Sequence, residues 1–287
     1  MDAQDISLFL QSDLKGSNLK IKNVSSINHL RDNSMIFINT TKHTFINDIN
    51  NSEFEFLVLC HKDSEVKLKK PHIFVDNPKY SFAKVLNEFF VDAPSSYIDE
   101  KNHIHPDAKI GVNPVIKSNV TIEKNVTIGN NCIIEENVII RKNTYIGDNC
   151  IIRANAVIGG EGFGFVRNES IPYRLPHVGG VIIKTNCEIG ENSIINKGTI
   201  DDTIISDNVK ISSLVKIAHN VLICENTMIA TGVQISGSCI ISKDVWIGTN
   251  STLTNKVKIG EKVTIGVGSV VVNDVLSKKI IKGNPAK

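Results

Sequence analysis

Aliphatic residues return every six positions along most of this chain. The series starts at Ile110 and continues without a gap to Ile158. It resumes at Ile183, slips once in phase near "NKGTIDDT", and then runs from Ile205 to Val271. Glycine, asparagine and other small or polar residues often follow the aliphatic position, as in "IGNN" and "IGEN". Such residues tolerate tight turns and positive φ angles, so the repeat predicts short strands separated by corners.

The six-residue period separates the possible architectures. An α-helix would place its apolar residues at a period of about 3.6, and barrel strands would alternate over longer segments. The period fits a parallel β-helix, in which three six-residue sides close one coil. With strands about 4.8 Å apart, about eight coils would form a prism ~40 Å long. The repeated isoleucines would fill its interior, because each coil buries its apolar face against the next.

The first hundred residues lack this period. Residues 54–60 ("FEFLVLC") and 72–78 ("HIFVDNP") are predicted to be buried strands, and residues 80–90 carry apolar side chains at helical spacing. The chain is therefore expected to be mainly β. A small N-terminal α+β domain over residues 1–98 would precede a β-helix over residues 99–287.

Composition narrows the function classes. The chain has 41% hydrophobic and 22% charged residues and a net charge of +2, and no segment concentrates Lys and Arg. No nucleic-acid partner is therefore expected. No stretch of eighteen apolar residues and no signal-like N-terminus is present, so we expect a cytoplasmic protein without a transmembrane segment. The six cysteines lack CxxC spacing, which favours small core residues over disulfides or a zinc site.

The first break in the repeat is predicted to leave the prism. Residues 159–180 hold several glycines, two prolines and the aromatic side chains of Phe163 and Phe165. Interruptions of a solenoid often carry function, because loops hold chemistry on a stable scaffold. The sequence "GEGFGF" is followed by no Lys-Ser/Thr and lies in no βαβ unit, which argues against a nucleotide P-loop. A surface loop that only seals against a neighbouring subunit is the alternative.

The second break lies close in sequence to a histidine in the repeat. Asp201 and Asp202 precede His219 by about one coil, so a carboxylate is expected to orient the imidazole, although the phase slip leaves the register open. Gly237 follows His219 by eighteen residues, which is one coil of three hexapeptides. Its N–H could stabilise an oxyanion, because no side chain stands in the way. A structural histidine is the alternative.

The combined motifs resemble one family. The segments "VIGGEGFGF", "GVIIKTNCEIGENSIINKGTIDDTIISDNVKISSLVKIAHNV" and "ATGVQISG" are similar to the hexapeptide-repeat UDP-3-O-(3-hydroxyacyl)glucosamine N-acyltransferases of lipid A (lipopolysaccharide) biosynthesis. The N-terminal "SMIFINTTKHTF" and "VDNPKYSFAKV" resemble that family's uridine-binding domain. The resemblance implies a homotrimer of left-handed β-helices with active sites between adjacent subunits. It makes His219 the general base and Gly237 the oxyanion donor.

The resemblance also implies substrate contacts. Of the family's nucleotide pocket, Phe37 matches, whereas Thr40 and His43 stand where the family has Asn and Tyr, so base recognition could differ. Lys256 replaces a second family histidine and could pair with a phosphate. The remaining assigned substrate contacts, which lie within the shared motifs, are Phe163, Phe165 and Asn220. The donor would be a thioester of acyl carrier protein or coenzyme A, with neither a metal nor a permanently bound cofactor.

Three other functions stay open. The C-terminal "IIKGNPAK" resembles sugar acetyltransferases that use coenzyme A, which favours a short-chain acyl-CoA enzyme acting on a dTDP- or UDP-amino-deoxysugar of a surface glycan. A metal enzyme of the β-helical carbonic anhydrase type needs three convergent histidines, but the repeat region offers His177 and His219 alone. A non-catalytic β-helix binding module is the remote alternative.

Overall fold

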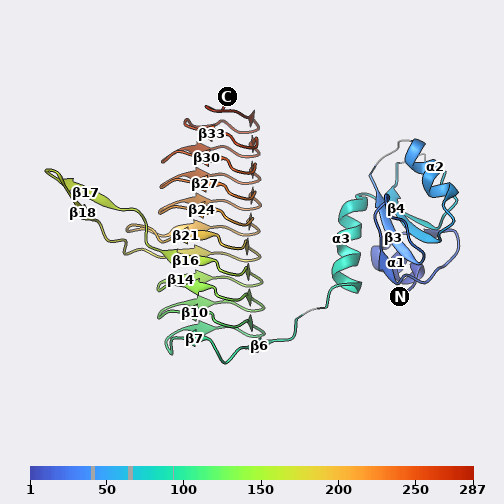
Figure 1. The fold of residues 1–287 in the computed structure, drawn as a ribbon, viewed down its shortest axis with the longest axis horizontal. Helices are drawn as coiled ribbons and strands as arrows, with labels where there is room; N and C mark the ends of the chain where they lie inside the picture. The colour runs from blue at the N-terminus through green and yellow to red at the C-terminus, as the bar shows by residue number, and fades with distance from the viewer. Residues whose placement is uncertain (40–42, 64–66, 93) are drawn as a thin grey trace. The chain divides into compact units, whose positions relative to one another are not determined.

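The chain forms two compact units. The computed structural model describes residues 1–39, 43–63, 67–92 and 94–287, and divides the chain into Met1–Ala93 and Pro94–Lys287 (Figure 1). The second unit begins before the start expected at residue 99, because Tyr97–Ile98 already pairs with Val115–Ile116 as a coil of the β-helix.

Unit 1 contains a five-stranded sheet in the order β1-β5-β4-β3-β2, in which only β1 runs antiparallel to its neighbour. Its strands are β1 (Leu14–Lys15), β2 (Asn23–Val24), β3 (Ser34–Ile38), β4 (Phe56–His61) and β5 (His72–Val75). Its described helices are α1 (Ala3–Leu10), α2 (His43–Asn51) and α3 (Pro78–Phe89). The strands and the helix predicted within residues 54–90 are therefore all present.

Helices cover both faces of this sheet. Leu57 and Leu59 of β4 share a buried cluster with residues of α1 and α3. Phe56 and Val58 point to the opposite face, into a second cluster that includes Ile46 and other residues of α2. Successive side chains of a strand point to opposite faces, so a strand covered on both sides must be apolar throughout, as "FLVLC" is.

Unit 2 is the predicted left-handed parallel β-helix, with three sheets forming the faces of the prism. The first face comprises β7 (His103–Ile104), β10 (Thr121–Ile122), β13 (Ile139–Ile140), β16 (Val157–Gly160), β21 (Ile194–Asn196), β24 (Lys216–Ile217), β27 (Gln234–Ile235), β30 (Thr252–Leu253) and β33 (Val270–Val271). The second face comprises β8 (Lys109–Ile110), β11 (Thr127–Ile128), β14 (Thr144–Ile146), β19 (Val181–Ile183), β22 (Thr203–Ile205), β25 (Leu222–Ile223), β28 (Ile240–Ile241) and β31 (Lys258–Ile259). The third face comprises β6 (Tyr97–Ile98), β9 (Val115–Ile116), β12 (Ile133–Ile134), β15 (Ile151–Ile152), β20 (Glu188–Ile189), β23 (Lys210–Ile211), β26 (Met228–Ile229), β29 (Trp246–Ile247), β32 (Thr264–Ile265) and β34 (Ile280–Ile281).

The repeated isoleucines fill the interior of the prism, as the period predicts. Ile140, Ile217 and Ile241, one from each of three strands, are fully buried in a single cluster that extends along the β-helix. Cys132 and Cys239 are buried in the same cluster, in agreement with the prediction that the cysteines serve as small core residues. One continuous apolar core therefore supports all the coils.

A ladder of amide side chains runs along the corner between the second and third faces. Each of its asparagines adopts a left-handed backbone conformation, for example φ 55° at Asn131 and φ 61° at Asn208. Five of the amides donate to the side-chain oxygen one coil further, and the pairs are Asn113 to Asn131, Asn131 to Asn149, Asn186 to Asn208, Asn208 to Asn226 and Asn226 to Asp244. Asparagine suits this corner because it tolerates positive φ and carries both a donor and an acceptor.

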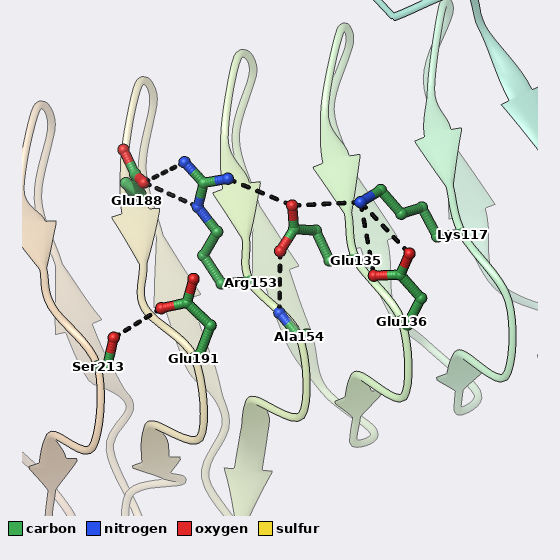
Figure 2. Close-up of polar contacts among 8 residues, drawn as sticks. All are labelled: Lys117, Glu135, Glu136, Arg153, Ala154, Glu188, Glu191 and Ser213. Atoms are coloured by element: carbon green, nitrogen blue, oxygen red, sulfur yellow. Dashed lines mark hydrogen bonds and ion pairs between the residues drawn. The ribbon is translucent and has the colours of Figure 1, made fainter.

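A second ladder, of charged side chains, crosses four coils beside the third face (Figure 2). Arg153 bridges Glu188, at 2.6 Å, and Glu135, at 3.2 Å. Lys117 continues the ladder with Nζ–O distances of 3.4 Å to Glu135 and to Glu136. Charges alternate along the ladder, so neighbouring coils attract each other. Each such pair near the surface contributes only about 0–1 kcal/mol.

Two irregular segments interrupt the stack. Strands β17 (Phe165–Asn168) and β18 (Ile171–Arg174) form an antiparallel hairpin that projects from the prism (Figure 1). Gly159 and Gly160 still belong to β16, and the hairpin lies within the predicted break at residues 159–180. We call residues 159–180 the excursion segment. Further along, Ile194 pairs with Lys216, 22 residues later, whereas regular neighbours such as Ile122 and Ile140 are 18 residues apart. Residues 198–201 are the four residues by which this coil exceeds a regular coil.

The asparagine corner predicts a specific stability difference. Replacing Asn208 with Ala removes its two ladder bonds and places a Cβ-bearing residue without a compensating amide at φ 61°. Asn208→Gly removes the same bonds but tolerates that φ. We expect Asn208→Ala to be less stable than Asn208→Gly by about 1–2 kcal/mol. Guanidinium unfolding followed by circular dichroism measures the difference, and equal midpoints for the two variants would refute the backbone explanation.

Candidate functional site

His219 lies at the corner between the first and second faces, two residues after β24 ends. Its side chain is half-buried. Its Nδ1 atom lies 3.0 Å from Oδ1 of Asn220 and 3.4 Å from Oγ1 of Thr199. Thr199 reaches this position because it lies in the four-residue excess of the lengthened coil. The imidazole is thus held on one side by an amide and a hydroxyl group.

The orientation of the Asn220 amide fixes the tautomer of His219. The amide oxygen accepts a hydrogen bond from the Thr199 N–H at 3.1 Å, and the amide nitrogen donates to the Asp201 carbonyl at 2.9 Å. These two backbone groups place the oxygen toward His219. An amide oxygen only accepts, so Nδ1 must carry the proton in the neutral ring and Nε2 keeps its lone pair. This is the tautomer that a general base acting through Nε2 requires.

Neither aspartate expected to orient His219 does so. Asp202 Oδ1 instead accepts a hydrogen bond from the Gly180 N–H at 2.6 Å, and Asp201 contributes its backbone carbonyl to Asn220. The expectation assumed an 18-residue coil, but the coil beneath His219 has 22 residues, so its register places Lys197 below the histidine. The orienting partner is therefore a neutral amide. The phase slip was the only sequence signal of this change.

Gly237 lies directly against the His219 ring. A Cβ atom at this position would lie 2.6 Å from Cε1 and 2.7 Å from Nε2 of the imidazole. Only glycine permits so close an approach. The Gly237 carbonyl accepts from the Lys256 N–H, whereas its own N–H donates no hydrogen bond within the described chain. A residue that packs against the imidazole and has a free backbone donor can supply the hydrogen bond that an oxyanion needs.

His177 also contacts His219, which sequence reasoning did not anticipate. The two ring centroids are 5.1 Å apart and the rings meet edge to face at 67°. His177 comes from the excursion segment and is 3% exposed. Neither ring nitrogen has a well-formed hydrogen bond within the described chain, although the Leu175 carbonyl lies near enough to raise the pKa slightly. Burial first, and then His219, lower the pKa of His177 overall.

The root of the excursion segment is fixed to the prism beside this pair. Lys197 is 5% exposed, and its ammonium group pairs with the carboxylate of Glu161. Asn196 donates to the carbonyls of Gly160 and Glu161, and Arg174 also approaches Glu161 at 3.5 Å. Burial is the largest single influence on the Glu161 carboxyl and raises its pKa, but the lowering effects of Lys197, Arg174 and His177 together outweigh it, so the pKa is lowered overall. Charge and hydrogen bonds therefore hold the segment at its base.

The other expected substrate contacts in unit 2 are exposed. Phe163 is 89% exposed and Phe165 44%, and their centroids are 5.1 Å apart. The Arg174 guanidinium lies 5.3 Å from the Phe165 ring. No contact between these aromatic rings and His219 is found among the described residues. Lys256 is exposed one coil beyond Gly237.

Unit 1 has a separate cavity of about 340 Å³. It is lined by Ser25, Ser26, Ile27, Phe37, Ile38, Asn39 and Phe45. Phe37 of β3 contacts Phe82 of α3 at a ring-centroid distance of 4.9 Å, so the Phe37 ring packs against this helix. Thr40 lies outside the described residues. His43 begins α2, and its side chain also lies outside what the structure describes.

The described ranges contain neither a metal-binding cluster nor a membrane-spanning helix. Within them, no group of three His, Cys, Asp or Glu side chains could hold a metal ion. The helices of residues 1–39, 43–63 and 67–92 include none with the length and apolar character needed to cross a membrane.

Comparisons with known proteins identify relatives of this chain. A family model described as "Bacterial transferase hexapeptide (six repeats)" matches residues 107–142 and 125–160. A UDP-3-O-acylglucosamine N-acyltransferase from Acinetobacter baumannii is 35% identical over 222 residues, and one from Methylobacillus flagellatus is 38% identical over 219. These matches cover 71% and 70% of this chain and 62% of each relative, so the chain matches less than two thirds of their length.

Solved structures agree with the sequence matches. A UDP-N-acetylglucosamine acyltransferase from Bacteroides fragilis is 30% identical, with a TM-score of 0.61. The match covers 67% of this chain and 73% of that one. The corresponding enzyme from Campylobacter jejuni is 27% identical over 67% of this chain and 73% of its own, with a TM-score of 0.60. With its six-residue repeat and its β-helix, the chain belongs to the family of hexapeptide-repeat acyltransferases that includes the UDP-3-O-acylglucosamine N-acyltransferases.

Proposed function

We propose that this protein is an N-acyltransferase that moves an acyl group from a thioester to the amino group of a nucleotide-linked amino sugar, as in lipid A biosynthesis. The arrangement at His219 carries the proposal. Asn220 fixes the Nδ1–H tautomer, and Gly237, which packs against the His219 ring, has a free backbone N–H within the described residues. A base and an oxyanion donor side by side are the two parts that acyl transfer to an amine needs.

The reaction follows from these positions. The amine nitrogen attacks the thioester carbonyl carbon, a C–N bond forms, and Nε2 of neutral His219 accepts the proton that the nitrogen loses. The carbonyl oxygen becomes an oxyanion and accepts a hydrogen bond from the Gly237 N–H. Collapse of this intermediate breaks the C–S bond. The departing sulfur takes the proton from His219, which leaves an amide, a thiol and the neutral enzyme.

The nucleotide is assigned to unit 1. The cavity beside Phe37 offers an aromatic ring for stacking and polar groups from Ser25, Ser26 and Asn39. Thr40 and His43 are part of the same proposed pocket on sequence grounds. Lys256 is assigned to the substrate phosphates, because it is an exposed cation one coil from Gly237.

The donor is a thioester of acyl carrier protein or coenzyme A, and no permanently bound cofactor takes part in the proposed reaction. The exposed aromatic rings of Phe163 and Phe165 are assigned to substrate contacts on the excursion segment. Both donor types are made in the cytoplasm, so the proposal includes a cytoplasmic location.

A homotrimer is part of the same proposal. Five successive strands of the second face present apolar side chains outward, and these are Tyr145, Ile182, Ile204, Leu222 and Ile240. All are exposed or half-buried in the single chain. An outward apolar stripe of this kind is typical of a subunit interface. The stripe borders the His219 corner, so a second copy seated on it would enclose the active site.

The first test is turnover. We expect the purified protein to acylate a UDP- or dTDP-linked amino sugar when given acyl carrier protein or coenzyme A thioesters of different chain lengths. His219→Ala should lower kcat by about 100-fold to 10,000-fold, because general-base catalysis is lost. Mass spectrometry of the product measures the transfer. A His219→Ala variant with wild-type kcat would disprove the assigned base, and use of only short acyl-CoA would favour the surface-glycan alternative.

The second test concerns the tautomer. Asn220→Gly keeps a residue suited to φ 57° but removes the amide that orients His219. We expect kcat to fall by about 10-fold to 100-fold, because the imidazole loses its fixed position. Asn208→Gly is the matched control, since it removes an amide from the same kind of corner at φ 61°, away from His219. Equal activity of the two variants would rule out the orienting role of Asn220.

The third test concerns assembly. Leu222→Asp places a charge in the middle of the apolar stripe, where desolvation on association would be costly. We expect light scattering to show monomers for this variant and trimers for the wild type. Thr264→Asp, on the third face, serves as the control and should remain trimeric. A monomeric wild-type protein would contradict the assembly.

A further inference from the structure

We propose that His177 is a positioning residue for His219: a buried neutral imidazole, carried by the excursion segment, that packs edge-on against the base and holds it over Gly237. This inference rests on the proposed role of His219 as general base. It adds a residue from the excursion segment to the corner that holds His219, and it gives the root of that segment a function.

The burial of His177 is the first observation. The side chain is 3% exposed, yet both ring nitrogens lack a well-formed hydrogen bond within the described residues. Unsatisfied buried polar atoms are rare in folded proteins, and each needs an explanation. The ring is placed against one particular neighbour, His219, at a centroid distance of 5.1 Å.

The space around His177 is shaped for an imidazole. A Cβ atom at Gly162 would lie 2.5 Å from Nε2 of this ring, and one at Gly164 would lie 2.5 Å from Cε1. Gly162 and Gly164 of "GEGFGF" therefore pack closely against the His177 ring. This motif has a packing explanation that requires no phosphate.

The segment that carries His177 is anchored on both sides. The Lys197–Glu161 ion pair and the Asn196 amide tie residues 160 and 161 to the prism. Where the segment returns to the prism, the Val178 and Gly179 N–H groups donate to the Thr199 and Gly198 carbonyls. Thr199 also contacts His219 through its hydroxyl group. His177 is thus held rigidly relative to the base.

The surroundings of His177 keep it uncharged. The ionisable groups that act on it are His219, Glu161 and Lys197. Burial and His219 lower its pKa, and Glu161, which would raise it, is already paired with Lys197. A lowered histidine pKa means that the neutral form persists to lower pH. When His219 takes the amine proton, His177 therefore does not compete for it, and its contribution is to the position of the ring.

Two substitutions test the proposal. His177→Ala removes the ring, and His177→Phe restores a planar ring without nitrogens. We expect kcat of the Ala variant to fall by about 10-fold to 100-fold with KM nearly unchanged, and the Phe variant to recover most of the loss. His103→Ala, which removes an exposed imidazole from the first face, is the control and should behave as wild type.

A spectroscopic readout separates this inference from the proposed function. In protein labelled with ¹⁵N at histidine, we expect the His219 signals to report the Nδ1–H tautomer in the wild type and in His177→Phe, and tautomer exchange in His177→Ala. If the wild type shows no transferase activity but the spectra change in this way, positioning stands and the N-acyltransferase assignment fails.

Three results would overturn the inference. One is unchanged kcat together with an unchanged His219 tautomer in His177→Ala. Another is a Phe variant that loses as much activity as the Ala variant, because a packing role predicts rescue. If His177→Ala fails to fold by circular dichroism, the Phe variant decides the question alone: folded and active supports positioning, whereas folded and inactive rejects it.

Discussion

The stacking of coils through backbone hydrogen bonds is the constraint on which this structure depends. Each strand of the prism pairs in parallel with the strand one coil away, and regular coils are 18 residues long, as for Ile122 and Ile140. Each isoleucine therefore lies above another isoleucine, and each corner above another corner. The asparagine ladder and the Lys117–Glu135–Arg153–Glu188 ladder both follow from this alignment, because residues one coil apart are spatial neighbours (Figure 2).

The corner that holds His219 is formed where this regularity fails. Four additional residues below His219 bulge outward and bring Thr199 and the Asp201 carbonyl to the Asn220 amide. In a regular coil those backbone groups would be absent, and the amide orientation would be undefined. The β-helix supplies a rigid position for the base and for Gly237, and the irregular coil supplies the hydrogen bonds that select the tautomer.

The excursion segment adds a second kind of contact. Its hairpin projects from the prism (Figure 1). Its root returns to the same corner and buries His177 against His219. At this root Lys197 pairs with Glu161 and the Asn196 amide nitrogen donates to the Gly160 carbonyl, whereas Oδ1 of Asn196 and both ring nitrogens of His177 have no hydrogen-bond partner among the described residues. His177 and the proposed base thus lie side by side. Proteins accept a local loss of folding stability at functional sites.

The sequence by itself determined the repeat, the prism and the placement of Gly237 one coil from His219. A strict six-residue period has few structural solutions, and His219 and Gly237 are related by one regular coil, so their contact follows from counting. The two buried strands and the helix of unit 1 were also readable, because a sheet covered on both faces requires uninterrupted apolar runs.

Only the tertiary structure showed which groups orient His219, the proposed base. The Asp202 carboxylate binds the Gly180 N–H, and Asp201 contributes its backbone carbonyl. Four additional residues shift the register of this coil, and the six-residue pattern does not show where in the coil they lie. The contact between His177 and His219 was equally hidden, since it depends on how a 22-residue segment without a period folds back onto the prism. Periodic positions are fixed by local geometry, whereas the path of an insertion is fixed by the contacts it finds.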